Sequence, residues 1–189
     1  MAISEQIIYG LERISEVYKT LLWEKAKVHG ISPIQIQLLL FIANHKSELC
    51  NITQLSKEFD LTKPTVSDAV KVLHHKKLLD KDFSSSDSRS YLLFLTNVGQ
   101  DLIKEIGGYA DPLENILTDL GPQQLESLYG TLTDLIFKLN QKGIIQVQRT
   151  CMGCRFHQKN KQTDYCNYLE KELFTQDIRL DCPEFDKKA

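Results

Sequence analysis

Four of the five cysteines of this 189-residue chain lie in its last 39 residues, and their spacing suits a metal centre. Two residues separate Cys151 from Cys154, a spacing that lets one tight turn direct both thiolates at the same ion. Cys166 and Cys182 follow singly. Four thiolates suffice for a closed tetrahedral zinc site or for an iron–sulfur cluster. The sequence therefore predicts a metal centre in the C-terminal tail, with zinc favoured and an iron–sulfur cluster as the alternative.

The composition of the tail supports a metal, although metal-free cysteines, buried or redox-active, stay an open alternative. Residues 144–189 have few aliphatic side chains, so a metal would compensate for a small apolar core. Disulfides are disfavoured in the reducing cytoplasm where we expect this protein. His157 could replace a cysteine ligand, but we expect it at the surface or beside a ligand. The fifth cysteine, Cys50, stands alone and is expected to be a small buried apolar residue.

A second group of residues could contact nucleic acid, and a short helix after Thr62 would position it. Thr62 is a helix-capping residue, and Pro64 falls in the first turn, where a missing N–H costs nothing. Val66, Val70 and Leu73 recur at intervals of four and three and form an inward face. The narrow polar face opposite them can enter a DNA major groove. The residues expected to meet the groove are Lys63, Pro64, Thr65, Ser67, Asp68, Lys71 and His75.

The neighbouring segments complete a helix-turn-helix with a hairpin. A preceding short helix is expected to be capped near its start by Thr53. The apolar positions of that helix and its turn are Leu55, Phe59 and Leu61. Residues 79–83 and 90–95 are short runs rich in large apolar residues, which predict two strands. Residues 84–89 between them include no apolar residue, so the hairpin tip must be exposed.

Three motifs in this region resemble the winged-helix pattern of the MarR (multiple antibiotic resistance regulator) family. They are Leu61-Thr62-Lys63-Pro64-Thr65-Val66-Ser67, Asp87-Ser88-Arg89 and Leu95-Thr96-Asn97-Val98-Gly99. The resemblance covers about Ser4 to Gln141. It implies that the second helix enters the major groove, that the hairpin tip reaches an adjacent minor groove, and that the outer helices form a homodimer.

The same resemblance assigns the wing residues. Asp87 and Arg89 match the aspartate and the second basic residue of the family's Asp-Arg-Arg signature, and Ser86 lies beside them at the tip. Three positions depart from the family pattern. They are Ser88, Asp68, where many members have Arg, and Lys77, where a Gly usually precedes the first strand.

The charge of the chain and its motifs narrow the function. A net charge of −2 argues against general polyanion binding, whereas a specific DNA reader needs only local positive potential. Residues 51–95 have a net charge of only +1, so a protein–protein adaptor that kept the winged helix but lost DNA binding stays an alternative. The sequence has no glycine-rich phosphate loop, no nucleophile with a plausible base and no His-Glu-x-x-His motif. We therefore expect no enzymatic activity.

Long helices are expected on both sides of the winged helix. Gly30 ends the first, and Ser32-Pro33 begins the next helix, whose buried face we expect from Ile36, Leu39, Leu40 and Ala43. Thr96 caps a helix over Asn97–Leu120 that Gly107-Gly108 and Pro112 should kink. Residues 4–28 and 123–141 carry seams of alternating three- and four-residue spacing, typical of dimer contacts. The seam residues are Ile7, Leu11, Ile14, Tyr18, Leu21 and Lys25 in the first segment and Leu125, Leu128, Leu132, Leu135 and Leu139 in the second.

Together these features predict a mainly α-helical winged helix-turn-helix protein with a small β-hairpin, outer dimerisation helices and a small metal-stabilised C-terminal appendage. The predicted segments are a dimerisation helix (1–30), a DNA-binding domain (31–95), helices completing the dimerisation region (96–143) and a metal-binding tail (144–189). We expect a homodimeric repressor that binds a pseudo-palindromic operator in double-stranded DNA and responds to a small-molecule or redox effector. The alternative is a redox or metal sensor or carrier, or an adaptor, whose cysteine tail is the functional part. No signal peptide or membrane-spanning run is visible, so we expect a cytoplasmic protein without membrane contact.

Overall fold

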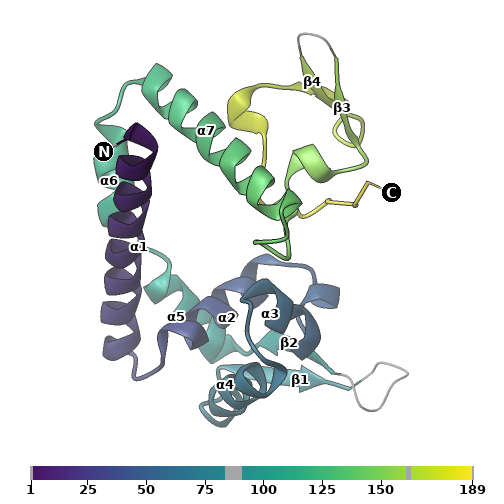
Figure 1. Ribbon diagram of the computed structural model, residues 1–189. Coiled ribbons are helices and arrows are strands. Elements are labelled where there is room, and N and C mark those ends of the chain that lie inside the picture. Colours follow the sequence, from purple (N-terminus) through teal and green to yellow (C-terminus); the bar gives the residue numbers. More distant parts are fainter. Residues whose placement is uncertain (1, 84–90, 161–162, 189) are drawn as a thin grey trace. The chain divides into compact units, whose positions relative to one another are not determined.

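The computed structural model describes residues 2–83, 91–160 and 163–188, and the chain divides into two compact units, Met1–Asn115 and Ile116–Ala189 (Figure 1). The first unit is mainly helical with one hairpin. Its elements in chain order are α1 (Ile3–Val28), α2 (Pro33–Asn44), a 3-10 turn (Ser47–Leu49), α3 (Ile52–Glu58), α4 (Lys63–His75), β1 (Leu79–Asp82), β2 (Leu92–Leu95) and α5 (Asn97–Ile106), followed by α6 (Asp111–Thr118), which crosses the boundary.

The residues that cap helix α2 set the point at which it begins. Gly30 has φ +61°, a left-handed conformation that ends α1, and Ser32 accepts a hydrogen bond from the backbone N–H of Gln35. Most of α2 is buried in the core of the first unit, including Ile36 and Leu39 as expected. The expected inward position of Ala43 is wrong, since this residue is exposed. The buried positions that the periodicity missed are Leu38, Phe41 and Ile42, because α2 is covered on more than one side.

The hairpin forms in the register that its apolar residues favour. Strands β1 and β2 are antiparallel, with Leu79 opposite Leu95 and Asp82 opposite Leu92. Leu79 and Leu93 are buried in the same core as the inner faces of α2, α3 and α4. The base of the wing is therefore packed against the helix-turn-helix.

The helix predicted over Asn97–Leu120 is two separate helices, so the break is larger than a kink. Helix α5 ends at Ile106, directly before Gly107-Gly108. Glycine disfavours the helical conformation because it loses more conformational entropy there than other residues do. Pro112 is the second residue of α6, a position where its missing N–H leaves no hydrogen bond unmade.

The second unit combines a long helix with a small β-structure. Its elements are α7 (Pro122–Gln141), a 3-10 turn (Cys151–Gly153), β3 (His157–Lys159), β4 (Asp164–Cys166), β5 (Lys171–Leu173) and a 3-10 turn (Thr175–Asp177). The three strands form one antiparallel sheet in chain order. A small core contains Cys151, Leu173 and Ile178, with Cys166 packed against it.

None of the described helices is by itself both long and apolar enough to cross a membrane. Among the residues that the structure describes, only α1 and α2 taken as a pair pass that test of length and composition, and the pair is bent by 92°.

Candidate nucleic-acid interface and cysteine cavity

Helix α4 is anchored by its cap and by one buried face. The hydroxyl of Thr62 accepts a hydrogen bond from the N–H of Thr65 at 3.3 Å, as the sequence predicts. Val66, Val70 and Leu73 are fully buried, and Ala69 is nearly so. These contacts fix which side of α4 faces solvent.

The opposite side of α4 presents the predicted groove-facing residues. Six of them are exposed, namely Lys63, Pro64, Thr65, Asp68, Lys71 and His75, and Ser67 is half-buried. Lys71 donates a hydrogen bond to Asp68 at 2.9 Å, and this bond raises the pKa of the lysine. The carboxylate at position 68 is thus engaged by a neighbour on its own helix.

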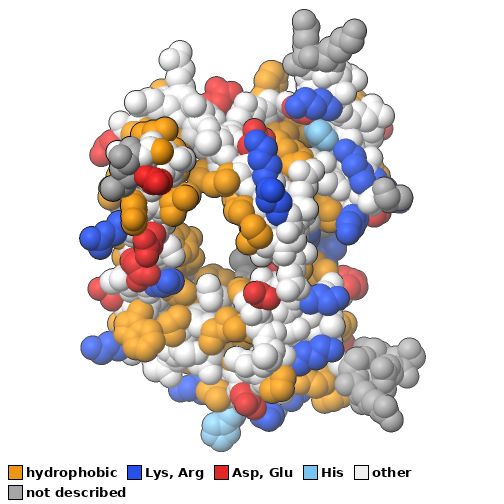
Figure 2. All heavy atoms as spheres, viewed as in Figure 1, with side chains coloured by type: hydrophobic (Ala, Val, Ile, Leu, Met, Phe, Trp, Pro, Cys, Tyr) orange, Lys and Arg blue, Asp and Glu red, His pale blue; other side chains and the backbone are white. Residues whose placement is uncertain are grey.

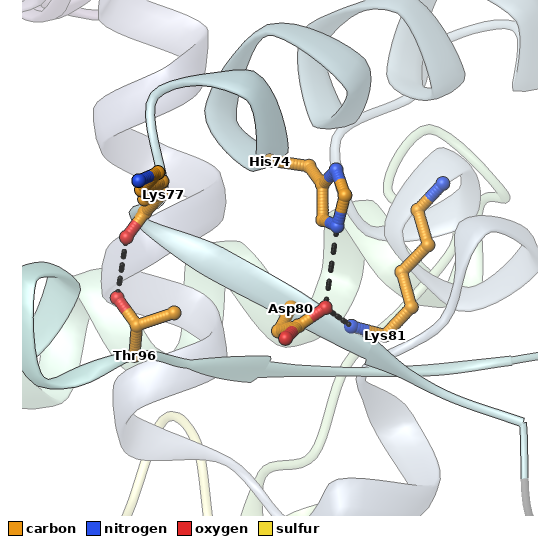
Figure 3. Close-up of polar contacts among 5 residues, drawn as sticks. All are labelled: His74, Lys77, Asp80, Lys81 and Thr96. Atoms are coloured by element: carbon orange, nitrogen blue, oxygen red, sulfur yellow. Dashed lines mark hydrogen bonds and ion pairs between the residues drawn. The ribbon is translucent and has the colours of Figure 1, made fainter.

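The C-terminal end of α4 is joined to the hairpin and to α5 by polar contacts (Figure 3). One ring nitrogen of His74 lies 3.2 Å from the Asp80 carboxylate, which also accepts the N–H of Lys81. The Thr96 hydroxyl donates to the carbonyl of Lys77 at 2.6 Å and accepts the N–H of Gly99 at 3.1 Å. The His74 side chain is 48% exposed, so both adjacent histidines at the end of α4 reach solvent. These bonds fix α4 relative to the wing.

Lys77 has a left-handed backbone conformation, at a position shortly before β1 where the family pattern usually has glycine. Its φ is +58°, in the left-handed region where glycine is favoured, and the MarR pattern has a glycine here. Lys77 in place of glycine therefore preserves the turn and adds a positive charge beside α4.

The predicted tip residues Ser86, Asp87 and Arg89 lie outside the described residues. At the base of the wing, the rings of Phe83 and Tyr91 have centroids 5.3 Å apart, and the Lys81 ammonium lies 4.6 Å from the Tyr91 ring centroid.

Cys50 is buried, as expected for a small apolar residue. It is 1% exposed, and burial, with a smaller contribution from Glu48, raises the pKa of its thiol to about 11. The thiol is therefore protonated and unreactive at neutral pH.

The four tail cysteines line one cavity, although they come from three separate segments. The cavity measures about 20 Å³, enough for about one water-sized sphere. Cys151 and Cys154 are on a tight turn closed by a hydrogen bond from the N–H of Cys154 to the carbonyl of Cys151 at 3.0 Å. Cys166 lies on β4, and the N–H of Cys182 bonds to the carbonyl of Arg149 at 2.9 Å. Sequence spacing alone could not place Cys166 and Cys182 beside the pair.

The cavity affects the chemistry of one of its thiols, that of Cys151. Burial raises the pKa of Cys151, a hydrogen bond from the backbone N–H of Arg179 lowers it, and the nearby Cys182, Cys166 and Cys154 raise it further. Within the described residues, no group of three or more His, Cys, Asp or Glu side chains could hold a metal ion as it stands.

His157 also lines this cavity, and it is buried rather than at the surface. One of its ring nitrogens, Nε2, lies 2.8 Å from the carboxylate of Asp164. The other, Nδ1, is buried without a hydrogen-bond partner among the described residues. No pattern in the sequence indicates the role of Asp164, which depends on the pairing of β3 with β4.

The tail also contacts α7 within the second unit. The hydroxyl of Tyr129 donates to the carbonyl of Ile178, and the methyl group of Thr175 lies 3.4 Å from where a side chain on Gly130 would begin. Arg179 follows Ile178 and donates its N–H to the sulfur of Cys151 at 3.3 Å.

Comparison with known proteins agrees with the winged helix. The sequence model of the MarR family matches residues 29–90. Members of that family are transcription regulators and not enzymes, so the prediction that this chain is not an enzyme is confirmed at the level of the family match. A comparison with curated protein sequences finds no match.

Solved structures similar to this chain share its fold. The Staphylococcus aureus MepR–DNA complex is 24% identical, with a TM-score of 0.61, over 69% of this chain and 96% of that one. A MarR transcriptional regulator from Methanosarcina mazei Go1 is 22% identical, with a TM-score of 0.61, over 73% and 98%. Staphylococcus aureus MarR in complex with salicylate and kanamycin is 20% identical, with a TM-score of 0.64, over 74% and 93%. These likenesses establish a MarR-type winged-helix fold.

Proposed function

We propose that this MarR-like chain is a DNA-binding transcriptional regulator whose helix α4 reads the major groove. The observation that carries the proposal is the exposed, polar outer face of α4, held in place by a buried inner face and by the bonds that join its end to the wing. The solved MepR–DNA complex, a protein of the same fold, supports this use of the fold.

The contacts on DNA follow from the positions of the side chains. Lys63 and Lys71 are cations on the outer face of α4 and are suited to phosphates, whereas Thr65 and Ser67 can bond base edges or phosphates. Arg89 at the wing tip would enter an adjacent minor groove, where a narrow groove concentrates negative potential.

We further propose a homodimer that acts as a repressor on a pseudo-palindromic operator. In the single chain, apolar side chains are exposed over α1 (Figure 2), among them seam residues Ile7 at 54% and Ile14 at 56% exposure. Leu128 and Leu135 of the α7 seam are exposed as well. Contiguous exposed apolar surface favours association, and a two-fold dimer would match two half-sites.

The proposed regulator responds to a small molecule or to oxidation. The complex of Staphylococcus aureus MarR with salicylate and kanamycin supports small-molecule binding by a protein of this fold. The cysteine tail supports the redox alternative, because its thiols would carry the response.

A second candidate function is metal or redox sensing by the tail, favoured by the convergence of the four cysteines on one cavity. We propose zinc as the bound metal, with an iron–sulfur cluster as the alternative. Metal binding would contribute to the folding free energy of the tail, which has a small core of its own.

DNA selection from a random library with the full-length protein tests the regulator, and an enriched inverted repeat is the expected result. Arg89→Ala should then weaken binding to the selected sequence about tenfold, the size expected for one specific contact. Lys104→Ala is the control, because it removes one positive charge from the exposed surface of α5. A library without any enriched sequence would contradict the regulator and favour an adaptor.

A further inference from the structure

The cysteine cavity is lined by one more donor group than a tetrahedral ion needs, and these described side chains would have to close around an ion, because no three of them are arranged to hold one as they stand. Four thiols and the imidazole of His157 line it. A tetrahedral zinc site takes four ligands, drawn from cysteine sulfur and histidine nitrogen. Which four of these five groups bind is therefore a question that the geometry around His157 can answer.

The sheet and Asp164 set the orientation of the His157 ring. His157 on β3 pairs with Cys166 on β4, so their side chains lie on the same face of the sheet. Asp164 is two residues before Cys166 and thus on that face as well. Its carboxylate takes the Nε2 side of the ring at 2.8 Å.

This contact decides what the other nitrogen can do. A carboxylate only accepts hydrogen bonds, so Nε2 of a neutral imidazole carries the proton and Nδ1 presents a lone pair. Nδ1 is buried, in a side chain that is only 8% exposed, and has no hydrogen-bond partner among the described residues. A buried polar atom without a partner destabilises the folded state, so a group that binds it is expected. A carboxylate–histidine–metal arrangement would supply that group.

We infer that the cysteine cavity binds one ion of the zinc class and that Nδ1 of His157 is one of its four donors, beside three of the four thiolates. The inference rests on the metal centre proposed above and names its ligand set. The cavity has room for about one water-sized sphere, which suits a single ion. Each thiol that binds releases its proton to solvent, and the fourth thiol stays uncoordinated beside the ion.

X-ray absorption spectroscopy at the zinc edge, with elemental analysis of protein purified without oxygen, tests the ligand set. The expected result is about one zinc per chain with a mixed shell, nitrogen at about 2.0–2.1 Å and sulfur at about 2.3 Å. A shell of sulfur alone would overturn the role of His157 and leave the metal centre standing. Iron with sulfide would overturn the single ion in favour of the cluster, and protein free of metal would overturn both the centre and its ligand set. The DNA selection is independent of all these outcomes.

Variants of the full chain provide a second readout that needs no spectroscopy. Asp164→Asn keeps the shape of the side chain but removes the charge that fixes the ring, and zinc affinity should fall about 10–100-fold in competition with a chelator. His157→Ala should weaken binding further, because it removes a ligand. His29→Ala, which removes an imidazole of the first unit that is not among the groove-facing residues, is the control and should bind zinc as the unmodified chain does. Unchanged zinc affinity in both Asp164→Asn and His157→Ala would overturn the inference.

Discussion

Asp68 and Lys71 form an exposed ion pair in the middle of the proposed groove-facing surface. Such pairs contribute little to stability, because solvent screens them. Their effect on binding is larger, since the Asp68 carboxylate, 2.9 Å from the Lys71 ammonium, offsets the positive charge that Lys71 would present to a phosphate. The carboxylate also repels phosphate at close range.

Replacing Asp68 with Ala should therefore raise affinity for DNA of every sequence by a similar factor. Binding to the selected operator and to scrambled DNA, measured at several salt concentrations, gives the comparison. Asp101→Ala is a matched control, because Asp101 forms the same type of exposed pair, with Lys104 on α5 at 2.8 Å. A loss of preference at a single base pair would show instead that Asp68 reads a base, such as the amino group of cytosine.

Gly99 permits the close approach of α5 to Leu78, the residue directly before β1. A Cβ atom there would lie 1.9 Å from the carbonyl oxygen of Leu78, a backbone atom that cannot turn away. Gly99→Ala should lower the free energy of unfolding by about 3 kcal/mol, near the upper end of overpacking effects. Urea denaturation measures it.

Gly10→Ala is the control for this substitution, since nothing lies within 4 Å of its Cβ position in α1. Replacing a helical glycine with alanine should stabilise by about 0.5–1 kcal/mol. Equal effects at the two positions would show that α5 is not held as closely as described.

At the scale of the elements, the sequence predicted helices from capping residues and apolar spacing, but it did not decide between two neighbouring capping residues. The caps at Ser32, Thr62 and Thr96 and the apolar spacing of α4 predicted three helix starts correctly. For α3, the cap is Asn51, which accepts the N–H of Gln54 at 3.0 Å, and Thr53 lies inside the helix instead. Two capping residues two positions apart leave such a boundary undecided in sequence.

The strands of the tail could not be predicted from the sequence, for a different reason. Its strands are three residues long, too short for an alternating pattern to appear. Cysteine spacing predicted the donor types, but the contact between His157 and Asp164 depends on strand pairing, which the sequence does not specify over so few residues.

The whole molecule exposes apolar surface that a second copy would cover. The seam of α1 stays largely exposed in the single chain, whereas its last turns bury Leu22 and Ala26 in the core of the first unit. The helix is thus anchored at one end and available along the rest of its length for association.

Ile14→Glu should convert the proposed dimer to a monomer, because it places a charge in the apolar seam at a residue that is 56% exposed in the single chain. Sedimentation equilibrium at micromolar concentration measures the mass. Val28→Glu is the control, since Val28 ends the same helix, is 77% exposed and lies outside the seam. A monomeric unmodified protein would remove the dimer and the inverted-repeat operator together.

The hydrogen bonds of Ile178 and Arg179 belong to a single peptide group. Its carbonyl oxygen accepts the hydroxyl of Tyr129 on α7, and its N–H donates to the sulfur of Cys151. Hydrogen bonds in a chain polarise one another, so the hydroxyl draws electron density toward the oxygen and makes the N–H a stronger donor. Electron density on one sulfur atom is thereby coupled to the position of one side chain on α7, through the dipole of a peptide group.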